Sequence, residues 1–77
     1  MPQEIILRVG DTIEYSKGQK GLIEKIRIIS SGKFVEEYVY KGNGKNLVLT
    51  LKDGRSTTNL WVKDTPINKI AEKQARG

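Results

Sequence analysis

Cationic and hydrogen-bonding side chains gather around the only tryptophan of the chain. The set consists of Lys45, Thr50, Lys52, Arg55, Thr57, Asn59, Trp61 and Lys63. Lysine and arginine neutralise phosphates, an indole stacks on bases or wedges between them, and hydroxyl and amide groups hydrogen-bond to phosphate, sugar or base edges. These residues therefore predict binding to nucleic acid, DNA or RNA, with little sequence preference. Lys25 and Arg27 extend the set if their strand lies alongside.

The members of this set from Thr50 to Lys63 share one face, together with Val48, if residues 47–63 form a β-hairpin. Asp53-Gly54 lies between two runs of alternating residues, which is the strongest short-range signal for a two-residue hairpin turn. In that register Lys52 pairs with Arg55, and successive side chains point to opposite faces. The face predicted to cover the core is mostly aliphatic and consists of Leu47, Leu49, Leu51, Thr58, Leu60 and Val62. A slip of one residue would exchange the two faces.

The same residues also have a purely structural interpretation. Threonine, lysine, arginine and asparagine occupy any solvent-facing strand, and a single tryptophan in a small β-domain is often a partly buried anchor. An alternative function is therefore a protein–protein interaction module or an accessory subunit that docks on a larger complex or self-associates, through Tyr38, Tyr40 and Trp61 or through a terminal helix. A third hypothesis is an oligomeric enzyme whose site forms on a symmetry axis.

The charge of the chain is unevenly distributed. Fourteen basic and nine acidic residues give a net charge of +5, but residues 41–63 hold five basic residues and one acidic residue, an excess of four. Such an asymmetry is typical of a face that binds a polyanion, although a moderate excess of lysine also keeps a protein soluble. The expected partner is nucleic acid, with a protein partner or a homo-oligomer as the alternative.

The composition argues against catalysis. The chain has no cysteine and no histidine, which excludes disulfides, thiolate or imidazole metal sites and the common catalytic triads. We therefore expect no enzyme activity, no metal and no cofactor. No apolar run approaches the roughly 20 residues that span a bilayer, and residues 2–7 lack the features of a signal peptide. The prediction is a cytoplasmic protein without a membrane partner.

Short β-strands are expected through most of the chain, in residues 4–8, 12–15, 22–30, 34–40 and the two arms of the hairpin. For residues 22–30 a helix competes, because Leu22, Ile26 and Ile29 also lie at helical spacing. The β-branched residues and the flanking glycines favour a long, bent strand, with different residues buried along its length. In residues 34–40 the valines are expected to point inward, which would leave Tyr38 and Tyr40 partly exposed.

The end of the chain changes to a helical period. Thr65 is a suitable N-cap and Pro66 a suitable first helical residue, and Ile67 and Ile70 lie about one turn apart. We therefore predict a C-terminal helix over residues 65–76 that docks its isoleucines on the sheet. With five or six strands in residues 3–63, the expected fold is mainly β: a single domain formed by a small SH3-like antiparallel barrel with a C-terminal α-helix. An OB-fold is the alternative.

Residues 8–26 carry a glycine-turn pattern with a known counterpart. A Gly-Asp opens one strand, and a glycine loop returns to an alternating apolar strand, at Gly10, Asp11, Ile13, Gly18, Gly21, Ile23 and Ile26. This segment resembles the signature of KOW-type SH3-like barrels. Because KOW domains occur in ribosomal proteins and transcription elongation factors, the resemblance implies contact with RNA, DNA or a polymerase.

Overall fold

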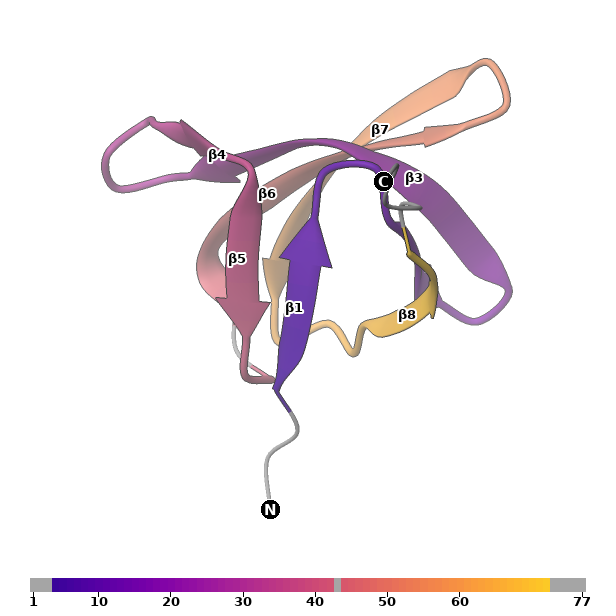
Figure 1. Cartoon of the computed structure of the whole chain (residues 1–77), viewed down its shortest axis with the longest axis horizontal. Coiled ribbons are helices and arrows are strands. Elements are labelled where there is room, and N and C mark those ends of the chain that lie inside the picture. The colour runs from indigo at the N-terminus through magenta and orange to yellow at the C-terminus, as the bar shows by residue number, and fades with distance from the viewer. Residues whose placement is uncertain (1–3, 43, 73–77) are drawn as a thin grey trace, which may run out of the picture.

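The chain forms antiparallel β-sheets, as its alternating runs predict. A computed structural model describes residues 4–42 and 44–72, and the regular structure of these residues is all strand. The strands are β1 (Ile5–Arg8), β2 (Thr12–Ser16), β3 (Gln19–Ile28), β4 (Phe34–Val35), β5 (Glu37–Tyr40), β6 (Gly44–Asp53), β7 (Ser56–Lys63) and β8 (Asn68–Ala71). β1 and β5 form a two-stranded sheet that faces the arching larger sheet (Figure 1). The larger sheet has the order β7-β6-β3-β2-β8, with β4 paired to β3.

Both sheets contribute to one hydrophobic core. Its buried members are Leu7, Ile13, Ile23, Ile26, Tyr40, Leu47, Leu49, Leu51, Val62 and Ile67. Of the buried side chains on the larger sheet's side of the core, half come from the β6–β7 hairpin. The others come from β2, from β3 and from Ile67, which directly precedes β8. The hairpin therefore anchors the fold as well as presenting the predicted binding residues.

β3 is a long strand with an irregularity in its middle, which confirms a strand in place of the competing helix. Ile23 pairs with Leu51 and Lys25 with Thr50, so β3 contains one extra residue relative to β6 at this point. Such a bulge bends a strand and changes which residues point inward. Ile23 and Ile26 are accordingly both buried, although they are three residues apart.

The strand expected over residues 34–40 is broken at Glu36, and its inward residues differ from the prediction. β4 pairs with β3, whereas β5 pairs with β1 in the other sheet. The break changes the alternation, so Tyr40 is 3% exposed and Val39 is 44% exposed. The expected partial exposure is therefore wrong for Tyr40, whereas Tyr38 is partly exposed, as predicted. The Tyr40 hydroxyl donates to the backbone oxygen of Thr65 at 2.6 Å, which satisfies the polar end of this buried ring.

The predicted C-terminal helix is wrong over its described residues. β8 is a strand that pairs with β2, with Ile13 opposite Lys69 and Glu14 opposite Asn68. Ile67 is buried in the core, whereas Ile70 is exposed. An isolated helix of about eleven residues is marginal in water, while the free edge of β2 offers hydrogen bonds to an incoming strand. Residues 73–76 of the predicted helix lie outside the described residues.

The strand count and closure also differ from the predicted barrel. The described residues form eight strands instead of the expected five or six, because residues 34–40 are divided and β8 is added. The two sheets do not join by strand pairing into a closed barrel among the described residues. Within residues 4–42 and 44–72, no helix is long and apolar enough to cross a membrane.

The β6–β7 hairpin has the predicted faces but a different turn. Asp53 pairs with Ser56 and Thr50 with Asn59, so Gly54-Arg55 is the two-residue loop. Gly54 has a φ of 62°, and Arg55 is not in a positive-φ conformation, the pattern of a type II′ turn. The pairing is offset by two residues from the predicted register, and an even offset leaves the strand side chains on their predicted faces, whereas Arg55 lies in the turn and not on the strand. The tip of this hairpin extends beyond the other strands (Figure 1), and residues 52–59 are exposed.

Candidate nucleic-acid interface

The side of β3, β6 and β7 that points away from the core carries most of the predicted binding residues. We call this surface the outer face and define it as Lys25, Arg27, Val48, Thr50, Lys52, Thr57, Asn59, Trp61 and Lys63. Residues paired across antiparallel strands point to the same face, so the strand register decides which of them are neighbours. Two cross-strand rows result: one joins Lys25, Thr50 and Asn59, and the other joins Arg27, Val48 and Trp61. The register thus places Lys25 and Arg27 alongside the hairpin.

Four of the predicted residues lie at the ends of the outer face or just beyond them. Lys52 and Thr57 pair near the projecting end of the hairpin, and Arg55 lies in the turn itself. Lys45 is exposed at the beginning of β6, beside the irregular pairing between Gly44 and Val48. The structure therefore gathers Lys25, Arg27, Thr50, Asn59, Trp61 and Lys63 at the centre of the sheet and sets the other four toward its ends.

Five cations of the outer face and its hairpin turn lie apart from carboxylates in the part of the chain that the structure describes. Within the described part of the chain, no carboxylate oxygen lies within 4.0 Å of the cations of Lys25, Arg27, Lys52, Arg55 and Lys63. Glu24 at the β3 bulge and Asp53 at the hairpin turn are close in sequence, but they too make no such pair. Uncompensated charges on one surface create a positive potential that attracts anions.

Trp61 is both held in place and accessible. The residue is 51% exposed, and the indole Nε1 donates to the backbone oxygen of Lys45 at 2.6 Å. Gly44 pairs with Lys63 and Val48 with Trp61, so β6 advances by four residues over a stretch in which β7 advances by two. The indole supplies a hydrogen-bond donor to this irregular stretch. A structural role at its nitrogen therefore coexists with an exposed ring.

Lys63 completes the environment of the indole. Its Nζ lies 4.2 Å from the centre of the Trp61 ring, a cation–π contact. Its backbone has a φ of 48°, the left-handed conformation that residues other than glycine rarely adopt. Residues held in such conformations cluster at binding sites, although a strand end can also require one.

The polar side chains between the cations are partly paired with each other. Thr50 Oγ1 donates to Asn59 Oδ1 at 2.9 Å, across the two strands of the hairpin. The amide NH₂ of Asn59 has no acceptor among the described residues, so it remains a donor for a phosphate or a base edge. The hydrogen bond fixes the direction of that donor.

Phe34 belongs to this surface and was missed in the sequence. It is 61% exposed and pairs with Arg27, so it continues the row that runs from Arg27 through Val48 to Trp61. Lys25 Nζ lies 5.7 Å from the centre of its ring. The alternation of residues 34–40 does predict an outward Phe34. Its position beside the basic strands depends on the β3–β4 pairing, for which the sequence contains no direct signal.

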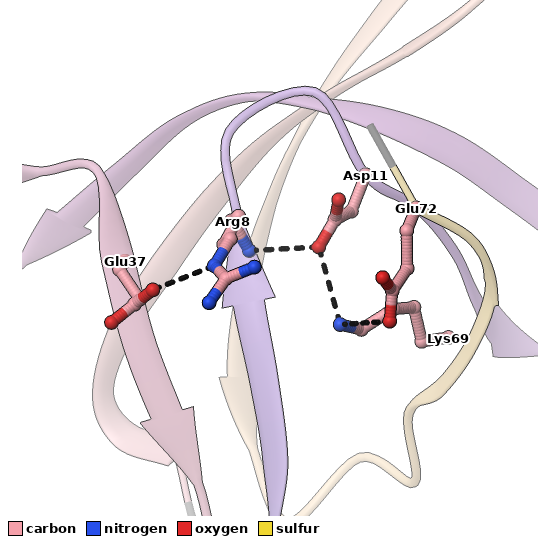
Figure 2. A network of polar contacts seen from close by, with 5 residues as sticks. All are labelled: Arg8, Asp11, Glu37, Lys69 and Glu72. Atoms are coloured by element: carbon pink, nitrogen blue, oxygen red, sulfur yellow. Dashed lines mark hydrogen bonds and ion pairs between the residues drawn. The ribbon is translucent and has the colours of Figure 1, made fainter. Parts of the chain in front are cut away.

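A second charged region has the opposite arrangement (Figure 2), and we call it the corner network: Arg8, Asp11, Glu37, Lys69 and Glu72. Asp11 is 1% exposed, and its Oδ2 accepts from the Arg8 backbone nitrogen at 3.1 Å and lies 3.4 Å from Lys69 Nζ. Lys69 also lies 3.2 Å from Glu72. These contacts tie β8 to the turn between β1 and β2, so their role is structural.

Arg8 forms the other ion pair of the corner network. Its Nε donates to Glu37 Oε2 at 2.6 Å across the β1–β5 sheet (Figure 2). This hydrogen bond and the negative charge of Glu37 raise the pKa of the Arg8 guanidinium further above its usual value. The carboxylates of the corner network are therefore each paired with one of its cations.

The described residues contain no group of three or more carboxylates placed to hold a metal ion. Comparisons of the chain with protein-family models, with curated proteins and with solved structures found no match.

Proposed function

We propose that this protein binds nucleic acid through the outer face, without strong sequence preference. The observation that carries the proposal is a set of five cations that have no carboxylate partner among the described residues. Four of them share the outer face with a half-exposed, hydrogen-bonded indole, and Arg55 lies at the hairpin turn. Cations that contact phosphates release condensed counterions, and an aromatic ring adds stacking that tolerates any base. The proposal includes a cytoplasmic location and assigns no catalytic reaction.

The finer fold assignment is part of the same proposal. We infer an SH3-like barrel of the KOW type, with the C-terminal helix of the original expectation replaced by β8. The bent β3, the glycine turn between β2 and β3, and the single core support it. In this view the outer face is the outside of the barrel wall, and contact with RNA or DNA is what the resemblance implies.

The test is a titration followed by the fluorescence of Trp61, the only tryptophan. Added oligonucleotide should quench the emission at low salt, and the emission should recover as salt rises. With about five phosphate contacts, affinity should fall roughly 10²-fold between 50 and 200 mM salt. A flat titration at low salt would contradict the proposal.

A pair of variants with equal charge separates the outer face from net charge. Replacing Lys52→Gln and Arg55→Gln together should weaken binding about tenfold or more, because two phosphate contacts are lost. The matched control replaces Lys17→Gln and Lys41→Gln, which are exposed cations outside the outer face. Equal losses in the two double variants would mean that net charge alone determines binding.

A second candidate function is docking on another protein, and a different surface favours it. Ile6 and Val39 pair across the small sheet with their side chains exposed, and Ile70 shares a shallow depression with Ile6. The tyrosines that the sequence offered for such an interface are mostly covered. Light scattering of the wild type and of Ile6→Asp tests this candidate: self-association that the substitution abolishes would support it.

A further inference from the structure

We propose that the nucleic acid bound by the outer face is single-stranded, with one base stacked on Trp61 and another on Phe34. This inference rests on the proposed function and adds the class of ligand and a second stacking position. It begins from the cross-strand row Phe34, Arg27, Val48 and Trp61, in which each residue lies on a different strand.

The two aromatic rings stand at the ends of this row with similar surroundings. Each aromatic residue is more than half exposed, and each ring has a lysine ammonium near its face: Lys63 at Trp61 and Lys25 at Phe34. A large exposed ring in a small protein has lost the free energy that its burial would provide. A ring that stacks on a base beside a cation that binds the adjoining phosphate explains both features at once.

The spacing of the row suits a single strand. Four strands are separated by three intervals of about 4.8 Å, which places the two rings roughly 14 Å apart. Stacked nucleotides advance about 3.4 Å each along a strand, so the gap corresponds to about four nucleotides, or fewer if the strand is extended. Arg27 lies between the rings, where it can contact the intervening phosphates.

The shape of the sheet also favours a single strand over a duplex. The larger sheet curves around its core (Figure 1), so the outer face is its convex side. A rigid duplex is itself convex and would touch such a surface over a short length, whereas a flexible strand can follow the curvature. The bases of a duplex are also stacked on each other, so a flat ring reaches them only by unstacking a step.

The experiment measures the affinity of the wild type for a labelled oligothymidylate of about eight nucleotides and for a hairpin duplex, by fluorescence anisotropy. The single strand should bind at least about tenfold more tightly. Phe34→Leu keeps an apolar side chain of similar size but removes the aromatic face, and it should weaken single-strand binding about tenfold. Phe34→Trp should restore it. Ile70→Ala, on an exposed aliphatic side chain outside the outer face, is the matched control.

The outcomes distinguish this inference from the proposed function. Binding of the single strand that is unaffected by Phe34→Leu, or duplex binding as tight as single-strand binding, overturns the inference and leaves nucleic-acid binding in place. A wild type that binds neither form at low salt overturns both. Since Phe34 is 61% exposed, its variants should melt at nearly the wild-type temperature, which separates lost stacking from lost folding.

Discussion

The corner network and the outer face both contain cations, but the surroundings of these cations differ. In the corner network Arg8 and Lys69 each lie against a carboxylate, and the buried Asp11 receives a backbone hydrogen bond as well. On the outer face the cations of β3 and β7 have no carboxylate partner among the described residues. The pair of Lys69 and Asp11 is largely buried and helps to hold the strands together, whereas exposed charges contribute little to folding. The comparison indicates that the corner network serves stability and that the outer face is free to serve binding.

The largest expected effect is on stability, at Asp11. Asp11→Asn removes the buried charge that faces Lys69 and weakens the hydrogen bond from the Arg8 backbone nitrogen. We expect a loss of about 3 kcal/mol in the free energy of unfolding and a decrease of roughly 10–20 °C in Tm. Thermal denaturation followed by circular dichroism measures it. Asp53→Asn at the exposed hairpin turn is the matched control and should change Tm by less than about 3 °C. Similar decreases in the two variants would remove the distinction between the regions.

The next effect is on binding, at the centre of the outer face. Lys25→Gln and Arg27→Gln together should weaken binding of oligothymidylate by roughly 30-fold at low salt, because two phosphate contacts are lost. Both side chains are exposed and have no carboxylate partner within residues 4–42 and 44–72, so Tm should change by only a few degrees. A double variant that binds normally but melts far below the wild type would assign these residues a structural role.

Trp61 makes a structural hydrogen bond through its nitrogen and also presents an exposed ring, so two substitutions separate the two roles. Trp61→Phe keeps an aromatic face but loses the hydrogen bond to the Lys45 oxygen, and should cost about 1 kcal/mol of stability with a modest change in affinity. Trp61→Ala loses the ring too and should weaken single-strand binding about tenfold. The anisotropy of a labelled oligonucleotide measures the affinity of both variants, since neither retains the intrinsic tryptophan fluorophore. If Trp61→Ala binds as the wild type does, the indole is an anchor alone.

The smallest effect concerns pH, at Tyr40. Burial, and secondarily the charge of Asp64, raise the pKa of Tyr40 above its usual value of 10.0. Below pH 10 the phenol is protonated in both states; above it the unfolded chain loses this proton first, so stability falls as pH rises through the folded pKa. The difference in the free energy of unfolding between the wild type and Tyr40→Phe should therefore decrease above pH 10. Urea denaturation at pH 8 and above pH 10 measures it, and a constant difference would contradict the assignment.

What the sequence predicted well depends on local alternation. The faces of the β6–β7 hairpin follow from a period of two, and the turn's actual position at Gly54-Arg55 altered the pairing without altering the faces. The exposed indole and the cations around it were identified for this reason. The bent β3 was also predictable, since no single face of that strand is apolar throughout its length.

Apart from the hairpin turn, the failures involve pairing between distant segments. Residues 65–72 have a helical pattern, but β2 offers its free edge to them, and the strand β8 forms instead. Tyr40 was placed outside because alternation was continued through Glu36, where the chain passes from one sheet to the other. Phe34 was left out of the binding set because only the β3–β4 register places it beside Arg27. Tertiary contacts of this kind override local propensity.

The salt dependence of binding tests the central claim most directly. The slope of log affinity against log salt concentration should be steep for the wild type, and Lys25→Gln with Arg27→Gln should reduce its magnitude by about 1.5, whereas Lys17→Gln with Lys41→Gln should leave it nearly unchanged. These results would show that the unpaired cations of the outer face contact phosphates. The account is contradicted if both double variants have the same slope, or if the wild type does not bind at low salt.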